Sequence, residues 1–92
     1  MDYCQKLSEL FKILLDKDSN LDQKIIAKNQ ILEICKHIPD VPQDILSIMI
    51  KGYSDDIDTY LNSPTYSKNS MEQLRTSLKL KFGCPDVKTI KR

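Results

Sequence analysis

The stretch that decides the fold lies near the start of the chain, where residues 3–15 read YCQKLSELFKILL. Its apolar side chains recur at spacings of three and four residues, which is the period of an amphipathic α-helix. These apolar positions are Tyr3, Leu7, Leu10, Phe11, Leu14 and Leu15. Asp2 is placed to cap this helix and the polar run from Asp16 ends it, so we predict a helix over residues 2–16.

The same period continues downstream until proline interrupts it. We predict a second helix over residues 22–38, ended by Pro39 because a residue that precedes proline is pushed out of the helical region. A third helix follows over residues 41–51, with Asp40 as its cap. Residues 45–50 of this helix are almost continuously apolar, so we expect it to be the most buried element.

The second half of the chain contains one or two further helices. After Gly52, residues 54–62 are expected to form a short helix, either kinked away from the third helix or continuous with it. A polar loop is expected over residues 65–70. The last helix is predicted over residues 70–82, with Ser70 and the side chain three residues later as a capping box. Glycine at 83 and proline at 85 stop it.

These elements predict an all-α fold, a compact bundle of four to five helices. Alternating β-branched runs bounded by hairpin turns are absent from the sequence. Residues 1–83 are expected to form one helical domain, and residues 84–92 a loosely ordered basic tail. The side chains expected to dominate the core are Leu10, Leu14, Ile34, Ile48, Leu74 and Leu78.

The cysteines predict a reduced, cytoplasmic protein. There are three of them, an odd number without the paired spacing of a zinc site or a small disulfide scaffold. Cys4 and Cys35 are expected to be small buried hydrophobes, and Cys84 to lie in a partly exposed turn. We expect no metal and no cofactor. A signal peptide and a membrane-spanning segment are not expected either, because no long apolar run is present.

Catalysis is not expected. The one histidine, His37, lies near the end of the second helix, where a cationic ring interacts favourably with the helix dipole. Two glycines cannot build a phosphate-binding loop. Residues 16–22 begin like an EF-hand calcium loop but lack its glycine and its closing glutamate, so we interpret them as a polar connection between helices.

Charge is distributed unevenly. Residues 1–70 carry eight lysines against eleven acids, whereas residues 71–92 carry six basic residues against two acids. The basic residues Arg75, Lys79 and Lys81 therefore offer an alternative site for nucleic-acid phosphates, although the sequence lacks the interleaved aromatic residues that stack on single strands. The other interpretation is a solubilising last helix.

A cluster of tyrosines and aspartates in the middle of the chain is the candidate partner-binding site. Tyrosine is enriched at interfaces, and neighbouring carboxylates steer a basic partner. The candidate residues are Tyr53, Asp55, Asp56, Asp58, Tyr60 and Tyr66. In the alternative interpretation, Tyr53 and Tyr60 pack inward and the aspartates are a solvated helix start.

The outline resembles the small four-helix immunity proteins that neutralise bacterial nuclease toxins, such as the colicin DNase inhibitors. The resemblance rests on residues 36–40 (KHIPD), the acidic tyrosine stretch at 53–60, and a last helix over residues 70–83. The adjacent tyrosine pair and the tryptophan of that family are absent, so the likeness is one of architecture and functional class. It implies a protein that occludes the basic active site of a toxin and carries out no chemistry of its own.

We therefore predict a non-enzymatic protein-binding module, with an immunity or inhibitor role as the favoured interpretation. A basic nuclease toxin is the partner that this interpretation suggests, and no membrane is involved. The alternatives are a small nucleic-acid-binding or regulatory module and a helical oligomerisation adaptor. The sequence leaves open whether the chain is a monomer or a homodimer.

Overall fold

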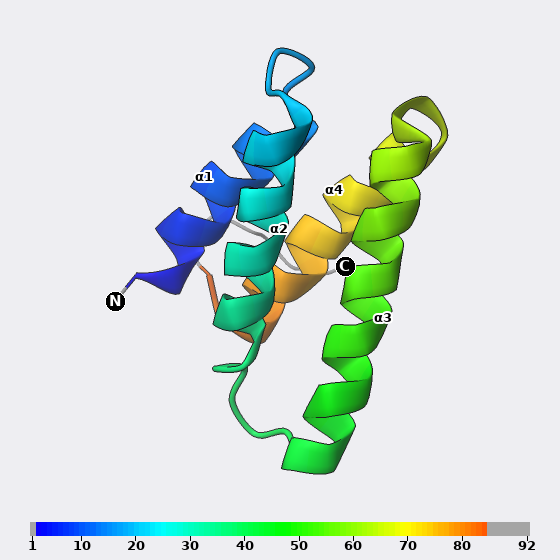
Figure 1. The fold of residues 1–92 in the computed structure, drawn as a ribbon. Coiled ribbons are helices and arrows are strands. Elements are labelled where there is room, and N and C mark those ends of the chain that lie inside the picture. The colour runs from blue at the N-terminus through cyan, green and yellow to red at the C-terminus, as the bar shows by residue number, and fades with distance from the viewer. Residues whose placement is uncertain (1, 85–92) are drawn as a thin grey trace, which may run out of the picture.

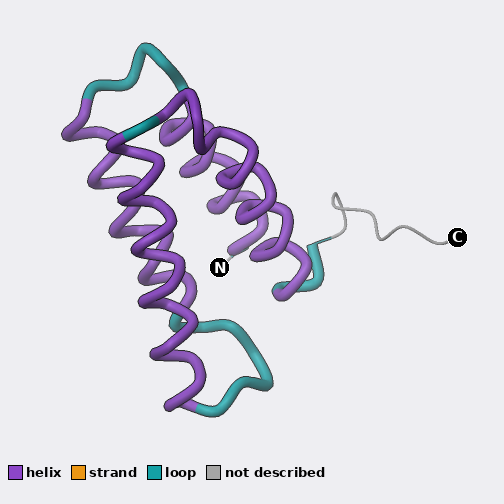
Figure 2. The backbone as a smooth tube through the Cα atoms, turned by 90° about the vertical axis from the view of Figure 1, so that its right-hand side faces the viewer, coloured by secondary structure: helices purple, strands orange, loops and turns teal. Residues whose placement is uncertain are grey.

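The structure is a computed structural model that describes the backbone of residues 2–84 and their side chains, except those of residues 64–67. Four helices follow one another: α1 (Tyr3–Leu15), α2 (Leu21–Cys35), α3 (Gln43–Asn62) and α4 (Pro64–Lys81). Each helix runs antiparallel to the one before it (Figure 1), with loops between them (Figure 2). The described part of the chain has no β-strand, which confirms the all-α class there.

The four helices form two hairpins that pack side by side. One hairpin is α1–α2 and the other is α3–α4, and between them α2 packs on α3 while α1 packs on α4 (Figure 1). The contact between α1 and α4 is the least extensive of these four. This topology brings the start of α1 and the end of α4 to the same end of the bundle.

Local hydrogen bonds explain where α1 and α2 begin. The carboxylate of Asp2 accepts a hydrogen bond from the backbone N–H of Gln5, which confirms the predicted cap. At the start of α2, the side chains of Asn20 and Gln23 each accept a hydrogen bond from the backbone N–H of the other, forming a capping box. α2 ends at Cys35, before the predicted end at residue 38.

α3 is one continuous helix of 20 residues, which decides between the two alternatives left open by the sequence. Glycine inside a helix costs about 1 kcal/mol relative to alanine. Gly52 nevertheless does not break α3, because buried side chains on both sides of it, Leu46 and Ile57, hold the helix against the bundle. The predicted helices over residues 41–51 and 54–62 are therefore a single element.

The predicted cap of α3 is wrong. The residue that precedes the helix is Pro42, and no side chain caps its first turn. Asp40 instead lies in the turn between α2 and α3 with φ of 64°, a left-handed conformation that aspartate tolerates better than most residues. Its role is therefore to form the turn between the two hairpins.

α4 begins earlier than predicted. It starts at Pro64, so the expected loop over residues 65–70 is helical and Ser70 lies inside the helix rather than capping it. Proline suits the first position of a helix, because its ring sets φ near the helical value and its missing N–H has no partner to lose there. The polar residues 68–70 are exposed, which is compatible with the outer side of a helix.

The end of α4 confirms the predicted stop. Gly83 has φ of 70° and its N–H donates to the carbonyl of Leu80, while the N–H of Cys84 donates to the carbonyl of Lys79. These two bonds form a Schellman motif, which reverses the chain direction after a helix. The motif turns Cys84 back toward the bundle, where it is buried rather than partly exposed as predicted.

All four helices contribute to one hydrophobic core. Five of the six predicted core residues are buried, namely Leu10, Leu14, Ile34, Leu74 and Leu78. The sixth prediction is wrong, because Ile48 is 72% exposed. α3 is not the most buried element either: of its residues only Leu46, Ile57 and Tyr60 are buried, whereas the neighbouring Ile45 is half exposed.

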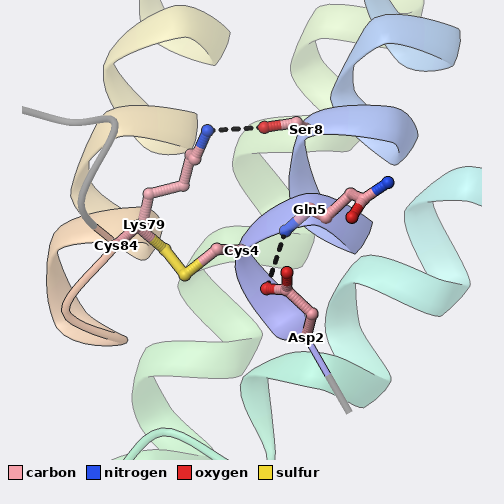
Figure 3. The surroundings of a disulfide bond; sticks show 6 residues. All are labelled: Asp2, Cys4, Gln5, Ser8, Lys79 and Cys84. Atoms are coloured by element: carbon pink, nitrogen blue, oxygen red, sulfur yellow. Dashed lines mark hydrogen bonds between the residues drawn. A yellow bond between two sulfur atoms is a disulfide. The ribbon is translucent and has the colours of Figure 1, made fainter.

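The prediction of three reduced thiols is also wrong. Cys4, in the first turn of α1, forms a disulfide with Cys84, 80 residues later (Figure 3). The Cα atoms lie 5.5 Å apart, a usual separation for a disulfide. Cys35 is a free cysteine and is fully buried, as predicted. The predicted basic tail lies outside the described residues, apart from Cys84.

Candidate protein-binding surface

The structure places the two described tyrosines of the predicted cluster on the inner side of α3. Tyr60 is 3% exposed and belongs to the core, and Tyr53 is half-buried against it. Burial raises the pKa of both phenols. They stabilise the bundle and offer little area to a partner. Tyr66, which was predicted to bind with them, has its side chain outside the described residues.

The three aspartates of the cluster are exposed but do not act as a unit. Asp58 points to α2, where its carboxylate lies 2.5 Å from the ammonium of Lys28. The carboxylate of Asp55 lies 3.9 Å from the ammonium of Lys51 one turn away, with both side chains well exposed. Asp56 is exposed on the same side of α3 as Asp55. Asp55 and Asp56 therefore remain available for a partner, whereas Asp58 already has a partner in the fold.

Two isoleucines join these acids on the outer side of α3, and the sequence analysis missed them. Ile45 is 48% exposed and Ile48 is 72% exposed. At about 100° of rotation per residue, they lie within one arc of roughly 100° together with residues 52, 55 and 56. This α3 surface, formed by Ile45, Ile48, Gly52, Asp55 and Asp56, is exposed at every one of those positions.

The α3 surface has an apolar end and an acidic end. Its isoleucines lie in the N-terminal half of α3, and its acids lie about 13 Å further along the helix on average, at a rise of about 1.5 Å per residue. Between them, a side chain at Gly52 would meet nothing within 4 Å, so the helix is bare there. A regular helix with this pattern can place an apolar contact and a charged contact on a partner at a defined separation.

A second apolar area lies on the outside of the α1–α2 hairpin. Ile13 of α1 and Ile26 of α2 line a hollow between these helices and are 39% and 56% exposed. The N-terminal half of α2 also exposes Leu21 and Ile25. The apolar residues of α2 are therefore only partly covered by the fold.

The basic residues of the last helix do not form one open site. Lys79 is 4% exposed, and its ammonium donates a hydrogen bond to the hydroxyl of Ser8 on α1 (Figure 3). Arg75 is half-buried and lines a hollow on α4 together with Glu72. Lys81 is exposed. The structure therefore removes Lys79, the central residue of this predicted phosphate-binding set, from the surface.

Cys35, the last residue of α2, and His37, two residues later, lie in different surroundings. Cys35 is fully buried, and burial raises the pKa of its thiol to about 12, so it is protonated near neutral pH. His37 is exposed and its ring stacks on Tyr3, with ring centres 5.2 Å apart. Because one group is inside the core and the other is at the surface, they do not form a nucleophile–base pair.

Within residues 2–84, no three His, Cys, Asp or Glu side chains come together as a set of metal ligands. None of the helices in this range combines the length and the apolar character that crossing a bilayer requires. No known protein family, curated protein or solved structure matches the chain.

Proposed function

We propose that this chain is a non-enzymatic protein-binding module, an inhibitor of the immunity kind that covers a basic surface of a bacterial toxin such as a nuclease. The observation that supports the proposal best is the exposure of Ile48, 72%, on the same side of a regular helix as Asp55 and Asp56. Two large apolar side chains exposed on one side of a helix, with carboxylates further along the same side, favour a surface that receives a partner.

The proposed mechanism is steric and electrostatic. Ile45 and Ile48 bury apolar area against the partner, and the two carboxylates at the other end of the α3 surface pair with its basic residues. α3 is held in the bundle by Leu46, Ile57 and Tyr60, so the surface is formed before binding. A preformed helix has little conformational entropy to lose on association.

This proposal revises the residues predicted from the sequence. Asp55 and Asp56 are retained, and Ile45 and Ile48 replace the inward tyrosines as the apolar contacts. A binding role for Asp58 or Tyr66 stays a prediction. The cytoplasmic location also stays a prediction. The disulfide between Cys4 and Cys84 weighs against it, because disulfides are rare in the reducing cytoplasm.

The test begins with capture from nuclease-treated source lysate by the tagged chain, followed by purification of the captured protein. We expect a basic protein whose activity the chain inhibits, with an affinity that falls as NaCl rises from roughly 0.05 to 0.5 M, because salt screens exposed charges. In purified form, Asp55→Asn/Asp56→Asn and Ile48→Ala should each weaken binding about ten-fold.

A matched control removes the same charge elsewhere. Asp18 lies in the loop between α1 and α2, and Asp22 lies in the first turn of α2; both are exposed and neither belongs to the α3 surface. The Asp18→Asn/Asp22→Asn variant should bind within about two-fold of the wild type at the higher salt concentration. An equal loss of affinity in both double variants would contradict a role for the α3 surface. An unchanged affinity in Ile48→Ala would contradict it as well.

The nucleic-acid alternative is less well supported, because the burial of Lys79 leaves Arg75 and Lys81 without the residue between them. Retention of nucleic acid at low salt, lost in Lys81→Gln, would favour that alternative over an inhibitor. Capture of nothing but further copies of the chain would favour the oligomerisation adaptor, with the exposed α1–α2 area as the contact.

A further inference from the structure

The disulfide joins helices of the two different hairpins, which pack on each other less extensively than the two helices within each hairpin do. α1 and α4 come from different hairpins, and their meeting line is defined here as the α1–α4 seam, formed by Cys4, Ser8, Lys79 and Cys84. One hydrogen bond from Lys79 to Ser8 crosses it, close to the disulfide (Figure 3). A covalent bond at this seam therefore reinforces a contact between the hairpins that is less extensive than the contacts within them.

The cysteine at the α4 end of the seam is held by a turn. Cys84 lies three residues after Lys81, the last residue of α4, and the Schellman motif at Gly83 directs it toward α1. The motif contributes two backbone hydrogen bonds, so without the disulfide these bonds and the burial of residue 84 are what keep it against α1. Short turns at helix ends are among the first parts of a protein to open.

The first turn of α1 is attached to the same end of the bundle. The ring centre of Tyr3 lies 5.2 Å from that of Phe82, the residue directly after α4, and the Tyr3 ring stacks on His37 beyond α2. Cys4 directly follows Tyr3, so the disulfide lies next to a cluster of rings in which the start of α1 and the ends of α2 and α4 meet. Opening it would release the start of α1 and the end of α4 together.

We propose that the Cys4–Cys84 disulfide is a redox-controlled latch, which locks the α1–α4 seam when formed and lets the seam open when a dithiol reductant breaks it. Cys4 is half-buried and Cys84 is 4% exposed, so the reductant's thiolate attacks the sulfur of Cys4 and Cys84 leaves as a thiolate. The reductant's second thiol then displaces Cys4 from the mixed disulfide. Two electrons and two protons pass to the protein, and the reductant becomes a disulfide.

The third cysteine does not interfere with this exchange. Cys35 is 0% exposed, and its thiol remains protonated because burial raises its pKa to about 12. Exchange requires a thiolate, and Cys35 offers none near neutral pH. The latch therefore has two defined states, with the same pair of cysteines bonded or reduced.

The experiment uses the full chain, refolded with oxidised and reduced glutathione, and compares its amide hydrogen exchange before and after dithiothreitol. We expect one free thiol before reduction. After reduction, amides at residues 3–8 and 79–84 should exchange about ten-fold faster or more, while those in the middle of α2 and α3 keep their protection. The Cys4→Ala/Cys84→Ala variant should show the reduced pattern without reductant, and Cys35→Ala should show the oxidised pattern.

Each other outcome overturns the latch. Three free thiols in the refolded protein would mean that the bond does not form. Unchanged exchange at the seam after reduction would mean that packing alone holds it. Loss of protection in every helix would mean that the disulfide is a staple for the whole fold, with no separate opening of the seam.

Discussion

The ammonium of Lys28 on α2 lies 2.5 Å from the carboxylate of Asp58 on α3, and this ion pair joins the two hairpins of the bundle. The side chain of Lys28 is 15% exposed and that of Asp58 is 53% exposed, so the pair is partly shielded from water. The pair between Lys51 and Asp55 is longer, at 3.9 Å, and lies within one exposed helix.

The first prediction contrasts these two ion pairs. In double-mutant cycles, Lys28→Met with Asp58→Asn should give a coupling energy of about 0.5–1 kcal/mol, because partial burial strengthens the attraction. Lys51→Met with Asp55→Asn should give less than about 0.3 kcal/mol. Urea unfolding of the wild type and the variants measures both, and equal couplings would contradict the difference in shielding.

The second prediction compares two isoleucines of α3. Ile57 is 0% exposed and Ile48 is 72% exposed. Ile57→Ala should lower the free energy of unfolding by about 2–5 kcal/mol, because it removes buried methyl groups and leaves a cavity. Ile48→Ala should change it by less than about 0.5 kcal/mol. A large loss of stability in Ile48→Ala would mean that this side chain is covered in the protein.

The third prediction concerns the two described residues with positive φ, Asp40 and Gly83. Asp40→Gly should raise the free energy of unfolding by up to about 1 kcal/mol, because glycine adopts this backbone without steric cost. Gly83→Ala should lower it by about 1 kcal/mol. A methyl group at 83 would meet nothing within 4 Å, so the loss reflects backbone conformation alone. Thermal unfolding should show shifts of opposite sign.

The fourth prediction is a loss of stability at alkaline pH that depends on Cys35. Burial raises the pKa of this thiol from 9.0 to about 12, so between these values the folded state keeps a proton that the unfolded state releases. The free energy of unfolding must therefore fall as the pH rises above 9.0, by at most about 1.4 kcal/mol per pH unit from this group, until the pH approaches 12.

Urea unfolding from about pH 8 to about pH 11 checks this slope. The Cys35→Ala variant should be less stable near neutral pH, because the substitution leaves a small cavity, but its stability should fall less steeply with pH. The tyrosines contribute a fall of the same sign in both proteins, since burial raises the pKa of Tyr53 and Tyr60 as well. Parallel curves would contradict a buried, protonated Cys35.

Helix starts and stops that depend on neighbouring residues could be predicted from the sequence. Asp2 and Gly83 act within a few residues of themselves, through a side-chain cap and a left-handed turn. The same local reasoning left open whether the helix continues through Gly52 and wrongly placed a helix start at Ser70, because a weak local preference for a break competes there with packing along a whole helix. Such a competition is decided by tertiary contacts, which the local pattern does not contain.

The candidate surface was harder to predict for a similar reason. The almost continuous apolar run at residues 45–50 gives no period, so it does not show which of its residues face the core. Ile48 lies outward because the neighbouring helices cover only the side of α3 that carries Leu46, Ile57 and Tyr60. The pairing of Cys4 with Cys84 likewise depends on how the two hairpins come together, 80 residues apart in the chain.

The bond between Cys4 and Cys84 also makes the described chain, in covalent terms, nearly a closed ring. A protease that cuts one loop between these residues would leave both fragments attached, so the nicked protein would run as one species on a non-reducing gel and as two after reduction. New ends could likewise be opened in the loop at Asp40 while the disulfide holds the former ends together. Residues 4 and 84 are thus far apart in the sequence but covalently joined.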